Sequence, residues 1–230
     1  MSESRPEHRS QPQPEPEAPR TPLVLLHGVG QAPMAWEDLV VRLYGSRRLL
    51  TPWVPGLRPT ETRSVPVEEA ADRMAQEIEL EGLGTVDLCA QSWGSMVATR
   101  LAAEHPGLVR RLVLIGGQVR TPRLLSGVQA GLLRMMPASR LADAGVSKDR
   151  LRAMLDVARR TDLSDALPRI TSPTLVLVGE RDRAGQLGAR ALADGIEGAR
   201  LRVVEGAGAA LNEERPEELE RLLRDFLDER

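Results

Sequence analysis

The stretch VDLCAQSWGS, residues 86–95, decides how this chain folds. It joins an apolar run of strand length to a segment of small residues around Ser92, and a helical pattern begins at Met96. Small residues two before and two after a serine, here Ala90 and Gly94, let a strand turn sharply into a helix. The stretch predicts a strand, a tight turn and a helix, with the Ser92 hydroxyl beside the N–H groups of the helix start. Such a pentapeptide also fits an ordinary loop serine, so its context decides.

Length and composition indicate one domain with a small insertion. The chain has 230 residues, of which 41% are hydrophobic and 28% charged, and its formal net charge is -2. This balance supplies no basic field for nucleic acid or for an anionic membrane. The single cysteine, Cys89, excludes an internal disulfide and a cysteine-rich metal site. We therefore expect no metal, no other cofactor, no nucleic-acid partner and no membrane partner, and nothing in the sequence indicates an oligomeric state.

Apolar strands alternate with amphipathic helices along the chain. Strands are predicted at residues 23–26, 48–54, 86–90, 112–115, 174–178 and 201–204, the second of them shorter and less regular. Helices are predicted around 36–43, from 65 to the glycines near 82, from Ser92 to Glu104, and from Pro216 to the C-terminus. Continuous apolar strands between helices are typical of a parallel sheet that is covered on both faces. The fold class is therefore α/β, with about six parallel strands and functional groups at the strand ends.

Two segments depart from this alternation. Residues 1–20 are rich in proline and charged residues, so we expect a disordered tail. Residues 118–169 have no strand pattern but carry helical faces at 125–135 and 151–158, which predicts a helical cap inserted into a core of 21–117 and 170–230. The first residues lack the apolar core of a signal peptide, and no apolar run is long enough to span a bilayer. A cytoplasmic location is the expectation.

Three strand ends carry chemistry in a recognisable order. His27-Gly28-Val29-Gly30 follows the first strand, Ser92 follows the third, and the segment GERD at 179–182 follows the fifth. In this order the chain resembles the α/β-hydrolase family from about residue 22 to about residue 228. The resemblance implies that Ser92 is the nucleophile, that the N–H groups of Val29 and Trp93 form the oxyanion hole, and that Asp182 orients the base. It also implies that the cap closes over the pocket and selects a small-molecule substrate.

The resemblance implies a histidine before the last helix, and this chain has none there. The glycine spacing of the loop at 205–212 places Ala209 at that position, and no neighbour is a histidine. A serine hydroxyl is a poor nucleophile near neutral pH unless a base removes its proton. Loss of the histidine in a serine protease costs about 10⁶ in kcat. The activity of this chain is therefore expected to be impaired.

The remaining histidines have plain structural interpretations. His8 lies in the tail, His105 ends a helix where positive charge is favourable, and His27 fits a loop residue with a structural hydrogen bond. Glu205 and Glu213 flank the loop, but a carboxylate with a pKa near 4 is too weak a base for a serine. Asp87 is interpreted as a polar residue at a strand edge.

Further candidates for the substrate-binding wall lie near Ser92 or the oxyanion loop. They are His27, Gly28, Met34, Trp36 and Met96. The apolar residues among them, at helix starts, fit core packing equally well.

Three functions remain open from the sequence. The favoured one is hydrolysis of a small ester, lactone or related acyl compound through Ser92, with the base lost at Ala209. The second is a cofactor-independent lyase, cyclase or decarboxylating enzyme, because stabilisation of an oxyanion needs no base. The third is a catalytically inactive protein that binds a ligand in the same cavity, since a fold alone does not establish activity.

Overall fold

A six-stranded, wholly parallel sheet forms the centre of the molecule. The computed structural model describes residues 20–61, 63–120, 153 and 156–229. The strands lie in the order β2-β1-β3-β4-β5-β6, and every neighbouring pair is parallel. Their bounds are β1 Leu23–Leu26, β2 Leu49–Leu50, β3 Val86–Gln91, β4 Val109–Ile115, β5 Thr174–Gly179 and β6 Arg200–Val204. The predicted α/β class and the number of strands are confirmed.

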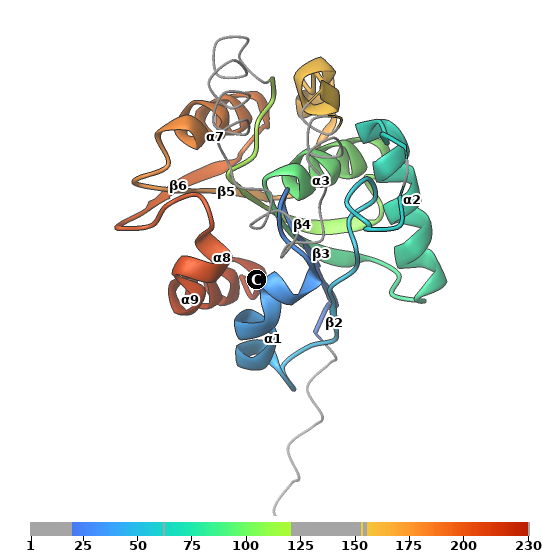
Figure 1. Ribbon diagram of the computed structural model, residues 1–230. Helices are drawn as coiled ribbons and strands as arrows, with labels where there is room; N and C mark the ends of the chain where they lie inside the picture. The colour runs from blue at the N-terminus through green and yellow to red at the C-terminus, as the bar shows by residue number, and fades with distance from the viewer. Residues whose placement is uncertain (1–19, 62, 121–152, 154–155, 230) are drawn as a thin grey trace, which may run out of the picture.

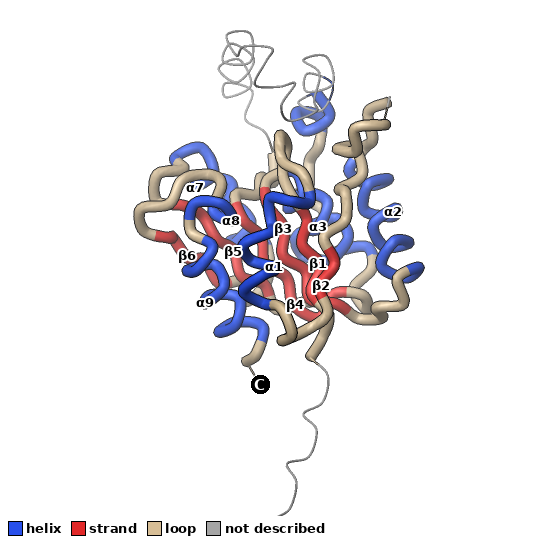
Figure 2. Tube along the Cα trace, turned by 60° about the horizontal axis from the view of Figure 1, so that its bottom comes forward, coloured by secondary structure: helices blue, strands red, loops and turns tan. Residues whose placement is uncertain are grey.

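Helices cover both faces of the sheet (Figure 1). Helices α2 (Val67–Leu80), α3 (Trp93–Glu104) and α7 (Arg183–Gly195) pack on one face. Helices α1 (Glu37–Leu43), α8 (Leu211–Glu214) and α9 (Pro216–Leu227) pack on the other, and these three stand in front of the strands in Figure 2. Two 3₁₀ turns, η1 (Pro33–Trp36) and η2 (Leu167–Arg169), lie between these elements.

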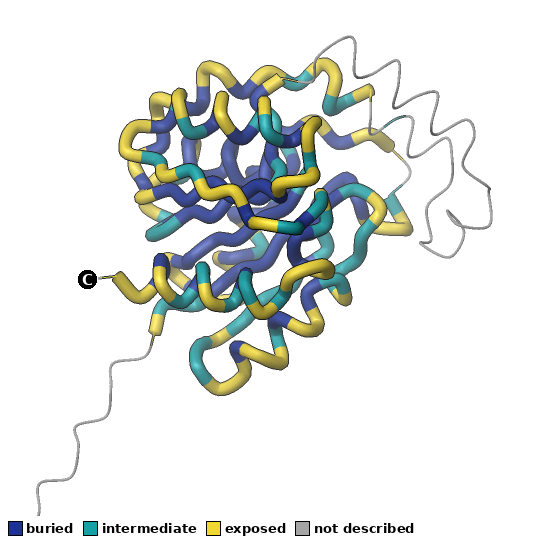
Figure 3. Tube along the Cα trace, turned by 90° about the vertical axis from the view of Figure 1, so that its left-hand side faces the viewer, coloured by how far each residue is buried: buried dark blue, intermediate teal, exposed yellow. Residues whose placement is uncertain are grey.

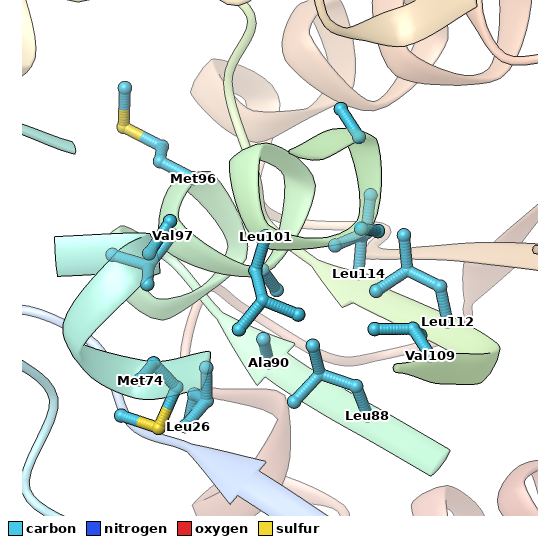
Figure 4. Packing of buried hydrophobic residues seen from close by; sticks show 14 of the residues in the cluster. Leu26, Met74, Leu88, Ala90, Met96, Val97, Leu101, Val109, Leu112 and Leu114 are labelled. Atoms are coloured by element: carbon cyan, nitrogen blue, oxygen red, sulfur yellow. The ribbon is translucent and has the colours of Figure 1, made fainter. Parts of the chain in front are cut away.

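The strands bury side chains on both faces, which explains their unbroken apolar runs. In β1, Val24 and Leu26 join the cluster under α2 and α3, whereas Leu23 and Leu25 join the cluster under α1 and α9. Figure 3 shows the buried sheet between outer layers that are exposed on their outward sides. Figure 4 shows the first cluster, in which Leu101 of α3 lies over the strand residues. A hydrophobic core on each face therefore supports the sheet, including the carboxyl ends of its strands.

Several predicted elements differ from the observed ones. The strand predicted at 48–54 is wrong in length, because only Leu49–Leu50 pairs with β1. Strand β4 begins three residues before its apolar run, at Val109. Helices α7 and α8 were not predicted, although Asp182 caps the first of them by accepting a hydrogen bond from the Gly185 N–H at 2.9 Å. None of the described helices is both long and apolar enough to cross a bilayer.

The two ends of the predicted cap insertion meet at one place on the core. Arg120 and Asp162 form an isolated antiparallel bridge, and the Leu163 N–H donates to the Val119 carbonyl at 3.0 Å. Residues 156–160 are helical, in agreement with the second predicted helical face. The first predicted face, at 125–135, and the predicted tail up to residue 19 lie outside the described residues. The cap boundaries therefore remain predictions.

The interpretation of Asp87 as a strand-edge residue is wrong. It lies in the interior strand β3 and is fully buried at the amino end of the sheet, away from Ser92. Its carboxylate accepts hydrogen bonds from Arg47 at 3.0 Å and from Arg110 at 2.9 and 2.6 Å. Burial raises the pKa of this carboxyl, while the guanidinium groups act in the opposite direction. Arg47 also pairs with Asp228, so the cluster fastens the C-terminal segment to the sheet.

Candidate active site

Ser92 occupies a strained turn between β3 and α3. Its φ of 54° and ψ of -116° make it the one non-glycine residue with positive φ in the described part of the chain. Such a conformation costs about 1–3 kcal/mol and persists only where its surroundings enforce it. The Ser92 N–H donates to the Ile115 carbonyl at 2.9 Å, and a Cβ at Gly94 would lie 2.6 Å from the Leu26 carbonyl oxygen. Backbone contacts therefore hold the hydroxyl at the carboxyl end of the sheet.

The loop after β1 lies directly against Ser92. A Cβ at Gly28 would lie 2.8 Å from the Ser92 Cβ, so only glycine permits this approach. Across the described residues, no acceptor is recorded for the backbone N–H of Val29 or of Trp93. The Trp93 ring is 3% exposed, and its Nε1–H donates to the Pro55 carbonyl at 3.3 Å. Two backbone N–H groups next to Ser92 thus have no acceptor among the described residues, one of them in the first turn of α3.

His27 supports this loop from within the protein and has both ring nitrogens engaged. The Val54 N–H donates to Nε2 at 3.2 Å, so the proton lies on Nδ1, which is 3.2 Å from the Gly28 carbonyl oxygen. The side chain is fully buried, and burial lowers its pKa to about 4. His27 is therefore a neutral structural residue and does not act as the base.

The depressed pKa of His27 predicts a loss of stability in acid. In the unfolded chain the imidazole binds a proton near pH 6.5, whereas the folded protein resists protonation down to about pH 4. Above pH 6.5 this difference in pKa does not oppose folding. As the pH falls from 6.5 to 4, it lowers the free energy of unfolding by about 3 kcal/mol. Urea unfolding across this window should show the decline, and His27→Asn should flatten it. The exposed His105→Asn serves as control; an equal slope in the His27 variant would contradict the assignment.

Asp182 also lies at the carboxyl end of the sheet, and its strand is two strands away from the strand that leads to Ser92. It follows β5, and its Oδ2 would be 3.7 Å from a Cβ at Gly116, the residue that follows the intervening strand β4. Neighbouring strands are about 4.8 Å apart, so β3 and β5 leave about 10 Å between them. Because Oδ1 caps α7, the carboxylate is held in one orientation with Oδ2 turned to the strand ends.

The loop that carries Ala209 is held by its neighbours although it carries no imidazole. Glu214 accepts from the Gly208 N–H at 2.7 Å and from the Ala210 N–H at 3.3 Å. The Arg181 N–H donates to the Ala207 carbonyl at 2.9 Å, which joins this loop to the residue before Asp182. The Ala209 side chain is exposed. The backbone framework for a side chain at position 209 is therefore complete.

The other candidate residues have different surroundings. Met34 is 68% exposed, whereas Trp36 is fully buried in the cluster under α1 and α9, where its indole packs in the core. Met96 is 5% exposed and belongs to the cluster under α3 (Figure 4). His105 contacts Asp72 at 3.2 Å at the opposite end of α3, about 18 Å along the helix from Ser92. His105 is thus too distant to replace the base.

Sequence reasoning missed a group of polar side chains behind the oxyanion loop. Gln31, Gln91 and Asn212 form hydrogen bonds with one another although they come from three distant segments. No motif marks them in the sequence, because each is an ordinary polar residue beside a glycine or a loop. In the described residues, no three histidine, cysteine or acidic side chains are grouped as they would be around a metal ion.

Comparisons with known proteins identify the family of this chain. The model of the alpha/beta hydrolase family matches residues 23–222. The chain belongs to the alpha/beta hydrolase family. Among curated relatives, the pimeloyl-[acyl-carrier protein] methyl ester esterase of Aromatoleum aromaticum is 39% identical over 97 residues, which cover 42% of this chain and 37% of that enzyme. The pyrrolizixenacetamide deacetylase of Xenorhabdus hominickii is 28% identical over 240 residues, which cover 89% and 90%.

Solved structures confirm the hydrolase fold. MGS-M2, an alpha/beta hydrolase from a Medee basin deep-sea metagenome library, superposes with a TM-score of 0.82 at 17% identity, over 96% of this chain and 92% of that one. The expected fold is therefore confirmed, and the family model confirms the expected family.

Proposed function

We propose that this site takes a small ester, lactone or related acyl compound, with Ser92 as nucleophile and the N–H groups of Val29 and Trp93 as oxyanion hole. The observation that carries the proposal is the strained Ser92 turn, which lies against Gly28 and next to two backbone N–H groups that have no hydrogen-bond acceptor among the described residues. Such donors stabilise charge that develops on a carbonyl oxygen. The names of two relatives, a methyl ester esterase and a deacetylase, denote acyl chemistry and support this class.

The proposed reaction proceeds through an acyl-enzyme. The Ser92 oxygen forms a bond to the carbonyl carbon, the C=O electron pair moves to oxygen, and the two N–H groups hold the resulting oxyanion. Collapse expels the alcohol or amine, and water then releases the acid. Each step moves a proton that a base at position 209 would carry between Ser92 and the leaving group. With Ala209 in that place the attack is slow, so this chain retains binding and oxyanion stabilisation but turns over poorly.

Covalent labelling of Ser92 by an aryl phosphonate tests this proposal. We expect slow modification of a single residue, Ser92, because the phosphoryl oxygen takes the place of the oxyanion. Ser92→Ala should abolish the labelling, and the exposed Ser64→Ala should not change it. Peptide mass spectrometry identifies the modified residue, and an equal labelling rate in Ser92→Ala would refute the role of the serine.

The same variants separate the other two functions. A non-hydrolytic enzyme that uses only the oxyanion hole would keep its activity in Ser92→Ala. An inactive binding protein would hold an acyl ligand without forming product, even after long incubation.

A further inference from the structure

Gln31 joins the oxyanion loop to the segment that follows Ala209. Its Oε1 accepts from the Gly28 N–H at 2.9 Å, and its Nε2 donates to Asn212 Oδ1 at 3.1 Å and to Glu213 Oε1 at 2.6 Å. Asn212, which is 1% exposed, also donates through Nδ2 to the Ala35 carbonyl at 2.8 Å. One amide side chain therefore contacts two loops that are 181 residues apart.

The surrounding groups allow only one orientation of the Gln31 amide. An ionised carboxylate is solely an acceptor, so Glu213 requires the NH₂ end of Gln31. The oxygen end must then face the Gly28 N–H, which is solely a donor. Reversing the amide would place the Gln31 oxygen against the Glu213 carboxylate. It would also place the Gln31 NH₂ group against the Gly28 N–H, so that two donors would face each other. Glu213 thus fixes which end of Gln31 meets the oxyanion loop.

Gln31 holds Gly28 through both its side chain and its backbone. The Gln31 N–H donates to the Gly28 carbonyl at 3.2 Å, and His27 Nδ1 lies 3.2 Å from the same oxygen. That carbonyl shares a planar trans peptide with the Val29 N–H, so the two groups point in opposite directions. Fixing the Gly28 carbonyl on the protein side therefore directs the Val29 N–H away from it. The Gly28 N–H is also occupied, so it does not compete for the ligand.

We propose that Gln31 is a positioning residue of the oxyanion hole and that Glu213 sets its orientation. This inference rests on the proposed function, because it assigns the Val29 N–H to a developing oxyanion. Such a residue acts on the transition state more than on substrate binding. Its loss should lower kcat and leave KM nearly unchanged.

The test uses aryl ester hydrolysis by the full chain carrying Ala209→His. Gln31→Met, which keeps the length and removes the polar atoms, should lower kcat about tenfold to a hundredfold, with KM within about threefold. Gln31→Glu should be at least as harmful, because it opposes two carboxylates. Adding Glu213→Gln to Gln31→Glu removes the opposition of two carboxylates and should recover part of the lost kcat, but the carboxylate at position 31 still faces Asn212 Oδ1. Gln76→Met and Glu79→Gln, on the exposed side of α2, are the matched controls.

Hydrogen exchange at the Gly28 amide tests the same contact without any turnover. In the chain as it stands, Gln31→Met should accelerate this exchange, whereas Gln76→Met should not. An unaltered kcat together with unaltered exchange would overturn the inference while Ser92 labelling upheld the proposed function. If Ala209→His gives no turnover at all, the assignment of position 209 fails, whereas Ser92 labelling still tests the proposed function and hydrogen exchange at Gly28 still tests the Gln31 contact.

Discussion

Replacing Ala209 with histidine is expected to raise the turnover of an activated ester by about 10³-fold or more. The loop already has its framework, since Glu214 holds the backbone on both sides of position 209 and Arg181 holds Ala207. Asp182, whose carboxylate caps α7, lies at the end of β5, where the proposed function has it orient an imidazole. On that proposal, the substitution supplies the missing base. Steady-state hydrolysis of an aryl ester measures the gain.

The gain should depend on position and on Asp182. Ala210→His, displaced by one residue, is the matched control and should give little turnover. In the Ala209→His background, Asp182→Asn should lower kcat by up to about 10⁴, as loss of the orienting acid does in a serine protease. A folded Ala209→His protein with unchanged turnover would contradict the assignment of this loop.

The largest effect on stability is expected from Asp87→Asn, which should lower the free energy of unfolding by about 3–5 kcal/mol. The carboxylate is fully buried and takes hydrogen bonds from Arg47 and Arg110, and the Arg47 side chain is only 2% exposed. Removing the negative charge leaves a buried guanidinium with a single remaining acid, Asp228. Urea unfolding gives the change directly.

An exposed aspartate provides the comparison for Asp87. Asp194→Asn, on the outer side of α7, should change the free energy of unfolding by no more than about 0.5 kcal/mol. A loss below about 1 kcal/mol in Asp87→Asn would show that the buried ion pairs contribute little to the fold.

Local chemistry made much of the fold predictable. The apolar runs located β1, β3 and β5, because strands buried on both faces need no polar positions. The small residues around Ser92 located the strained turn, which the structure has at φ 54°. Helix α7 escaped prediction because its glycines weaken the helical pattern; Gly188 is required by its close contact with the Gly117 backbone.

Contacts between distant segments could not be read from the sequence. The hydrogen bond between Gln31 and the Gly28 N–H is oriented by Asn212 and Glu213. No spacing rule in the sequence connects these two residues to Gln31. Trp36 looked like a pocket residue because it follows the oxyanion loop, but it is buried in the core cluster on the face of the sheet that α1, α8 and α9 cover. Burial of polar or aromatic groups of this kind is decided by the tertiary fold.

The pattern of what is kept and what is missing favours a hydrolase-type site over an unrelated pocket. The strained Ser92 turn, the N–H groups of Val29 and Trp93 and the helix-capping Asp182 are all present at the strand ends, and on the proposed function the residue at 209 is the one missing from the catalytic set. A chain long released from function would be expected to have lost several of these features together.

The most direct measurement is a crystal structure of the chain after reaction with an aryl phosphonate. It should show phosphorus bonded to the Ser92 oxygen and one phosphoryl oxygen within about 3 Å of both the Val29 and the Trp93 nitrogen atoms. A phosphoryl oxygen that turns away from these two N–H groups, or a phosphonate bonded to another residue, would contradict the account.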